Sequence, residues 1–143
     1  MTLIKFLSLN VRGLRNHVKR RALFSYLKNQ KADFYCLQET FSLKGDEVSW
    51  ATEWGGKVFF SHGTEHSKGT CILQRPNSLF SSSVQLIDPD GRLVIVTNPF
   101  SGSIYLTKPI FNSRRFKFFS IYQPQLSIFP INKPWICVFF CYM

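Results

Sequence analysis

Two polar residues, each placed directly after a short apolar run, are the first candidates for chemistry in this sequence. Asn10 follows the run 3–9, and Glu39 comes shortly after the run 34–37. A carboxamide and a carboxylate are both oxygen donors of the kind that holds Mg²⁺ together with water and phosphate oxygens. If folding brings them together, they form a binding site for such a cation. The plainer alternative is that polar residues end strands because loops are solvated.

The segment between the two candidates has the pattern of a helix joining two strands. Both apolar runs lack clean alternation, which is typical of strands buried on both faces. Asn16 suits the N-cap of a helix over 16–29, whose apolar residues recur at helical spacing: Leu14, Val18, Ala22, Leu23, Tyr26 and Leu27. A strand–helix–strand unit makes 3–9 and 33–38 parallel neighbours. Because parallel strands end at one edge of a sheet, Asn10 and Glu39 are expected to converge there.

Five motifs stand in an order that resembles a known family. They are Leu-Ser-Leu-Asn-Val-Arg-Gly-Leu (7–14), Cys-Leu-Gln-Glu-Thr (36–40), Trp-Gly-Gly-Lys-Val-Phe-Phe-Ser (54–61), Ser-Lys-Gly-Thr-Cys-Ile-Leu (67–73) and Asp-Gly-Arg-Leu-Val-Ile-Val (90–96). The series resembles the endonuclease/exonuclease/phosphatase superfamily, and most of all the apurinic-type endonuclease domain of non-LTR (LINE-type) retrotransposons. The resemblance implies that Glu39 is the metal-binding glutamate, that Asn10 helps to bind metal and phosphate, and that Mg²⁺ is the cofactor.

The remaining elements fit the fold that this resemblance implies. The pattern predicts a short helix over 47–53, antiparallel pairs 57–61 with 70–73 and 83–87 with 92–97, and a strand over 104–107. The second pair surrounds Asp88-Pro89-Asp90-Gly91, a strong turn signal. The expected fold class is α/β: a partial sandwich of the deoxyribonuclease-I-like type, with two packed mixed sheets and outer helices, and with its C-terminal half missing.

Residues 108–143 differ in composition from the rest. They hold ten aromatic residues, four prolines and five basic residues, but no acid and no glycine. We therefore expect 1–107 to be the N-terminal portion of an endonuclease-like domain and 108–143 to be an unrelated aromatic, basic tail. A genuine variable C-terminal segment is the alternative. The stretch that contains Tyr122 resembles, at a shifted position, the strand that carries the family's phosphate-contacting tyrosine.

The later catalytic motifs of the family have no counterpart here. No acid follows Asp90 and no histidine follows His66, whereas the resemblance implies Gly-Asp-Phe-Asn and Ser-Asp-His motifs further on. His17, His62 and His66 match none of these and are expected to be surface residues.

The charge of the chain favours a polyanionic partner. The formal net charge is +10, and eight Lys or Arg residues precede the first acid, Asp33. This predicts nucleic acid as partner, contacted by Arg12, Arg15, Lys19, Arg20 and Arg21, and the resemblance implies that the nucleic acid is DNA. The alternative is a solvated basic helix face.

Several classes of protein are not expected. No apolar run reaches the ~18 residues of a membrane span, and Asn10 and Arg12 interrupt the N-terminal run too early for a signal peptide. Cys36 and Cys71 are expected in buried strands of an intracellular protein, nuclear or cytoplasmic, without disulfide partners. Cys137 and Cys141 have no second pair to form a zinc site. Oligomeric state is left open.

Three hypotheses for function follow. The first is a truncated Mg²⁺-dependent phosphodiesterase-type DNA endonuclease of retroelement origin, inactive alone because the family's water-activating histidine and aspartate are missing. The second is a non-catalytic basic module that binds nucleic acid. The third is a remnant without molecular function.

Overall fold

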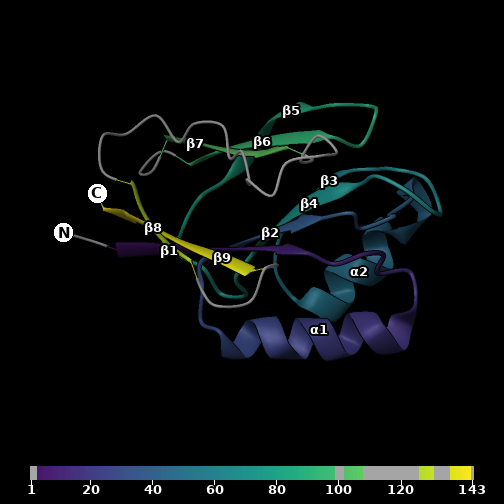
Figure 1. Cartoon of the computed structure of the whole chain (residues 1–143), viewed down its shortest axis with the longest axis horizontal. Coiled ribbons are helices and arrows are strands. Elements are labelled where there is room, and N and C mark those ends of the chain that lie inside the picture. The colour runs from purple at the N-terminus through teal and green to yellow at the C-terminus, as the bar shows by residue number, and fades with distance from the viewer. Residues whose placement is uncertain (1–2, 99–101, 108–125, 131–135, 143) are drawn as a thin grey trace.

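The computed structural model describes residues 3–98, 102–107, 126–130 and 136–142, which form two sheets and the helices that cover one of them (Figure 1). The elements are β1 (Leu3–Asn10), α1 (His17–Asn29), β2 (Phe34–Gln38), the 3-10 helix η1 (Lys44–Asp46), α2 (Glu47–Trp54), β3 (Val58–Ser61), β4 (Thr70–Gln74), β5 (Ser83–Ile87), β6 (Leu93–Asn98), β7 (Gly102–Thr107), β8 (Leu126–Pro130) and β9 (Ile136–Tyr142). The larger sheet has the order β3-β4-β2-β1-β9-β8 and the smaller has β5-β6-β7. Both helices lie on the outer side of the larger sheet.

The strand–helix–strand start is confirmed. β1 and β2 are parallel neighbours, with a register that runs from Phe6 opposite Phe34 to Asn10 opposite Gln38. Asn16 caps α1, since its Oδ1 accepts hydrogen bonds from the backbone N–H groups of Val18 at 2.9 Å and Lys19 at 3.1 Å. This unit fixes where the two candidate residues lie.

The predicted buried face of α1 is partly wrong. Val18 and Tyr26 are 65% and 45% exposed, and Ala22 is also exposed. The buried positions are instead Arg20, Phe24 and Leu27. This i, i+4, i+7 stripe faces the core because the Phe24 ring packs edge-on against Trp54 of α2, and because Arg20 finds a carboxylate there.

Aromatic side chains fill the layer between the helices and the larger sheet. Trp54 contacts Phe24 and Tyr35 edge-to-face, with ring centroids 5.4 and 5.2 Å apart, and donates its indole N–H to the Gln74 carbonyl at 2.6 Å. Trp50 packs against Phe60. Full burial of each such ring stabilises the fold by roughly 2–3 kcal/mol, so these residues anchor the strands behind the candidate site.

The smaller sheet packs over β3 and β4 on the opposite side. Phe34 stacks on Phe6 and on Phe80, which links the larger sheet to the segment that leads into β5. The two predicted antiparallel pairs and the strand now seen as β7 are confirmed. Only the larger sheet is mixed; the three described strands of the smaller one are antiparallel throughout.

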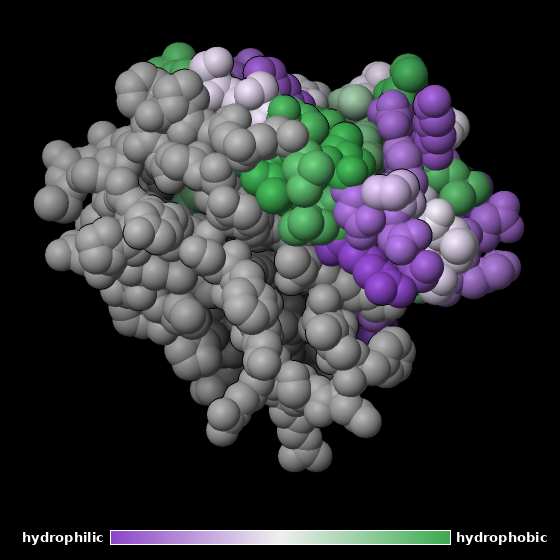
Figure 2. Space-filling view, turned by 90° about the horizontal axis from the view of Figure 1, so that it is seen from above, coloured by the Kyte–Doolittle hydropathy of each residue, from purple (hydrophilic) through white to green (hydrophobic). Residues whose placement is uncertain are grey.

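The edge strand β5 of the smaller sheet carries exposed apolar side chains. Val84, Leu86 and Ile87 are 41%, 49% and 45% exposed. Figure 2 looks onto the smaller sheet, where hydrophobic side chains gather next to a hydrophilic area. The register shift between Val84 and Leu86 is a bulge that makes this edge strand irregular.

Part of the predicted tail contributes strands. β9 pairs antiparallel with β1 from Leu3 opposite Tyr142 to Leu9 opposite Ile136, and β8 pairs with β9. The backbone of this hairpin thus pairs with the edge of β1 that lies opposite to β2. Tyr122 lies outside the described residues. Within the described part of the chain, no helix has the length and apolar character that crossing a membrane requires.

Candidate functional site

Asn10 and Glu39 lie at the same edge of the larger sheet. Asn10 is the register partner of Gln38, the residue before Glu39. The parallel pairing continues past the strand ends, because the Gly13 N–H donates to the Glu39 carbonyl at 2.6 Å and the Leu14 N–H to the Thr40 carbonyl at 2.9 Å. Both candidate residues are half-buried. The predicted juxtaposition of their backbones is therefore present.

The loops at this edge hold four non-glycine residues in left-handed backbone conformations. Arg12, Glu39, Phe41 and Lys68 have φ values of 47°, 55°, 56° and 63°. Each such residue costs on the order of 1 kcal/mol and persists only where surrounding contacts impose it. Here the Phe41 N–H bonds to the Lys68 carbonyl at 3.0 Å. Strain of this kind clusters at functional sites.

Gly69 marks the tightest approach between these loops. Its φ is +87°, and a Cβ there would lie 2.5 Å from Thr40 Oγ1. Its carbonyl accepts from the Thr40 N–H at 3.0 Å. The loop after β2, which begins with Glu39, is thus held against the start of β4.

Asn10 is the last member of a row of polar residues that crosses four strands. Ser61 pairs in register with Thr70, Thr70 with Gln38, and Gln38 with Asn10. Register partners project to the same face of a sheet. This face is the one toward the smaller sheet, because the Ser61 hydroxyl donates to the Asp88 carbonyl at 2.6 Å. The Thr70 hydroxyl is buried and, among the described residues, has no hydrogen-bond partner.

His62 was expected to be a surface residue, and it is partly buried, with 22% of its side chain exposed. Its ring stacks on Phe60, its Nδ1 lies 3.0 Å from Ser42 Oγ, and its Nε2 lies 2.7 Å from a Glu47 carboxylate oxygen. Ser42 is fully buried, so its hydroxyl cannot reach a substrate as a nucleophile. The three residues instead tie the loop after β2 to α2. No local sequence signal marks them, since they lie 15 and 20 positions apart.

His17 and His66 are exposed, as predicted. Cys36 and Cys71 are buried and free, also as predicted. Burial raises the pKa of the Cys36 thiol to about 12 and raises the pKa of the Cys71 thiol as well. Neither cysteine therefore supplies a thiolate nucleophile at neutral pH.

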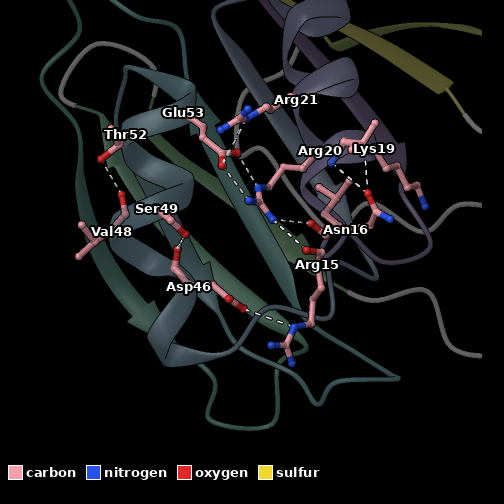
Figure 3. Close-up of polar contacts among 12 residues, drawn as sticks. Arg15, Asn16, Lys19, Arg20, Arg21, Asp46, Val48, Ser49, Thr52 and Glu53 are labelled. Atoms are coloured by element: carbon pink, nitrogen blue, oxygen red, sulfur yellow. Dashed lines mark hydrogen bonds and ion pairs between the residues drawn. The ribbon is translucent and has the colours of Figure 1, made fainter.

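The five residues of the predicted basic cluster do not all face the solvent. Arg20 does not lie on the surface: it is 6% exposed, and its guanidinium bonds to both Glu53 oxygens at 2.6 and 2.8 Å (Figure 3). The same group donates to the Leu14 and Arg15 carbonyls and lies over the Trp50 ring. Arg20 is therefore not available to contact nucleic acid.

The other four members of the cluster are exposed. Arg15 pairs with Asp46 at 3.9 Å and Glu65 at 3.2 Å, and Arg21 lies 3.9 Å from Glu53. Lys19 directs its ammonium onto two backbone carbonyls of the loop that contains Arg12. Exposed ion pairs of this kind are weak, so these contacts contribute little to the stability of the fold.

The donor set at the edge fits a hard cation that keeps several waters. A carboxylate from Glu39 and a carboxamide oxygen from Asn10 suit Mg²⁺. In the described part of the chain, no three His, Cys, Asp or Glu side chains gather into a metal-binding group. The pair alone would therefore hold a metal loosely.

The profile of the endonuclease/exonuclease/phosphatase family matches residues 7–136, most of the chain. The chain belongs to this family. The match extends past residue 107, and the domain boundary expected there stays a prediction.

Two curated relatives are each 30% identical to this chain. One is the "Transposon TX1 uncharacterized 149 kDa protein" of Xenopus laevis, matched over 117 residues, which are 82% of this chain and 8% of the relative. The other is the "Exodeoxyribonuclease" of Bacillus subtilis, matched over 116 residues, 78% of this chain and 44% of the relative. The chain thus spans less than half the length of either.

The solved structure of the AP endonuclease LMAP from Leishmania major superposes with a TM-score of 0.60 at 23% identity, over 74% of this chain and 40% of that one. This likeness shows the fold. Together with the two packed sheets and outer helices, it confirms the predicted α/β class of the deoxyribonuclease-I-like type.

Proposed function

We propose that this chain contributes the metal-binding and phosphate-binding edge of a Mg²⁺-dependent DNA endonuclease domain of retroelement origin. The observation that carries the proposal is the placement of Asn10 and Glu39 at the carboxyl ends of adjacent parallel strands. Family membership and the similarity to a transposon protein support it. DNA is the proposed substrate because the other relative is named an exodeoxyribonuclease and the superposed structure is that of an AP endonuclease.

Each residue has a defined role in this proposal. The Glu39 carboxylate binds the metal, and the Asn10 carboxamide orients the phosphate beside it. Mg²⁺ held there would supply Lewis-acid polarisation of the scissile phosphate. Arg12, next to Asn10 and exposed, lies where it can approach a DNA backbone.

We further propose that the part of the domain present here does not cleave DNA alone. His62, which follows β3, is engaged by Ser42 and Glu47. A general base typically contributes ~10²–10⁴-fold to rate, and the sequence has no acid after Asp90 and no histidine after His66 to match the water-activating pair that the resemblance implies. More of the length found in the relatives is expected to complete the site.

A plasmid-nicking assay tests this proposal. Purified protein with Mg²⁺ and supercoiled DNA is expected to give no nicking above a metal-free control. Glu39→Ala, which removes the proposed ligand, is the matched variant. Nicking that disappears in Glu39→Ala would contradict the proposed inactivity and show that the pair suffices for cleavage.

A non-catalytic role in binding nucleic acid is the second candidate, favoured by the exposure of Arg12 and Arg21. Contacts of Lys or Arg with phosphates release counterions, so non-specific dissociation constants of ~10⁻⁴–10⁻⁶ M should rise steeply with salt. The double variant Arg12→Gln/Arg21→Gln should flatten that dependence, whereas Lys31→Gln at the far end of α1 should not. Affinity that is independent of salt would exclude this role, and no affinity at all would favour a remnant without function.

A further inference from the structure

Lys19 makes contacts that a phosphate-binding lysine on a helix surface would not make. Its Nζ donates to the Val11 carbonyl at 2.7 Å and to the Arg12 carbonyl at 3.0 Å. Lys19 lies in the first turn of α1, and that turn contains no acid. A cation is disfavoured at the positive end of a helix dipole, so the two carbonyls are what stabilises the ammonium there.

The two carbonyls belong to the turn that directly follows Asn10. Arg12 has the strained φ of 47°, and its N–H donates to Asn10 Oδ1 at 3.1 Å. Lys19 thus holds one side of the Arg12 backbone while the Asn10 carboxamide holds the other. If the ammonium is removed, the left-handed conformation at Arg12 loses one of its supports.

The same turn also connects to Glu39. The N–H of Gly13, the next residue, donates to the Glu39 carbonyl at 2.6 Å. A change in the turn would therefore alter both the direction of the Asn10 carboxamide and its spacing from Glu39.

We propose that Lys19 is a positioning residue whose ammonium fixes the Asn10–Gly13 turn, and with it the Asn10 carboxamide relative to Glu39, rather than a contact to nucleic acid. The relevance of this positioning to metal binding rests on the proposed function. The effect of Lys19 on the turn itself does not.

Three variants test the proposal. Lys19→Met removes the ammonium but keeps a long apolar stem, Lys19→Arg keeps donors that can reach carbonyls, and Lys44→Met removes an equal charge from an exposed site in η1. The readouts are amide hydrogen exchange at Arg12 and the NMR signals of the Asn10 side-chain amide. A purely global loss of stability would not change the Asn10 signals selectively.

In Lys19→Met we expect exchange at the Arg12 amide to speed up by about tenfold, the effect of one lost hydrogen bond to a charged group. The Asn10 signals should shift, Lys19→Arg should restore them in part, and Lys44→Met should leave them unchanged. Unchanged Arg12 exchange and Asn10 signals in Lys19→Met, with a DNA-binding salt slope reduced by about one, would overturn the proposal.

A Mn²⁺ titration separates this inference from the proposed function. We expect Lys19→Met to weaken Mn²⁺ binding about tenfold, as is typical when a residue that orients a ligand is removed. If the unaltered protein binds no Mn²⁺ while Lys19→Met still perturbs Asn10, the positioning inference is supported and the proposed metal function is overturned.

Discussion

The edge of the larger sheet and the first turns of α1 both carry polar side chains, but they use them differently. At the sheet edge, Asn10 and Glu39 are half-buried, and the Asn10 carboxamide accepts a local hydrogen bond from the Arg12 N–H. On α1, the Arg20 guanidinium is buried and occupied by Glu53 and by backbone carbonyls. The number of charges on a helix therefore overstates the charge that is available to a partner.

The energetics of the two regions also differ. The sheet edge contains strained backbone that neighbouring loops impose, as at Glu39 and Phe41. The start of α1 contains like charges near the positive end of a helix dipole, which is unfavourable. The Glu53 carboxylate from α2 offsets that repulsion. The helix start is thus specialised for stability, and the sheet edge holds the groups suited to chemistry.

The largest expected effect is on the buried ion pair. Arg20→Met should lower the free energy of unfolding by about 3 kcal/mol, because it leaves the mostly buried Glu53 carboxylate without its partner. Arg21→Met is the matched control, since Arg21 is 69% exposed and should cost under about 0.5 kcal/mol. Urea unfolding measures both, and equal losses in the two variants would refute the difference drawn between them.

The sheet edge should respond most at Gly69. Gly69→Ala is expected to lower the free energy of unfolding by about 2 kcal/mol, because φ is +87° and the new Cβ would press on Thr40 Oγ1. Gly45→Ala adds a Cβ with nothing within 4 Å and is the control. Thermal unfolding and exchange of the Thr40 amide report the change. If both variants were equally stable, the close approach of these loops would be in doubt.

A smaller effect is expected from pH. The hydrogen bond from Arg20 lowers the pKa of Glu53, below an unfolded value of about 4.3. The resulting stabilisation is fully present above about pH 4.3 and is lost as the pH falls through the lower, folded pKa. Unfolding free energy should therefore drop more steeply from pH 5 to about 3 in the unaltered protein than in Arg20→Met. Parallel curves would show that Glu53 is not coupled to Arg20.

The two short apolar runs and the helical spacing between them predicted the strand–helix–strand start and the N-cap at Asn16. The parallel pairing of the two strands predicted the edge shared by Asn10 and Glu39. These follow from local pattern and from the geometry of parallel strands. Pairing between Arg20 and Glu53 could not be predicted in the same way, because the two lie 33 positions apart. One signal was present: Arg20 shares a helical stripe with Phe24 and Leu27, which indicates a buried arginine and hence a buried partner.

The His62 contacts and the β8–β9 hairpin were also missed. The first depends on how loops from β2 and β3 meet at one edge. The second depends on the sheet order, since β9 joins β1 from the other end of the chain. The apolar run 136–142 is typical of a strand, but its composition does not indicate which strand it pairs with. Whether 108–143 is unrelated to the rest of the chain stays a prediction.

The central claim is that Asn10 and Glu39 form one metal-binding edge, and Mn²⁺-induced NMR line broadening tests it most directly. Glu39→Gln removes the carboxylate charge, and Glu65→Gln makes the same change at a 62% exposed loop site. We predict broadening centred on residues 10–13 and 38–40 in the unaltered protein and in Glu65→Gln, and its loss in Glu39→Gln. Broadening that persists in Glu39→Gln, or that centres elsewhere in the chain, would contradict the account.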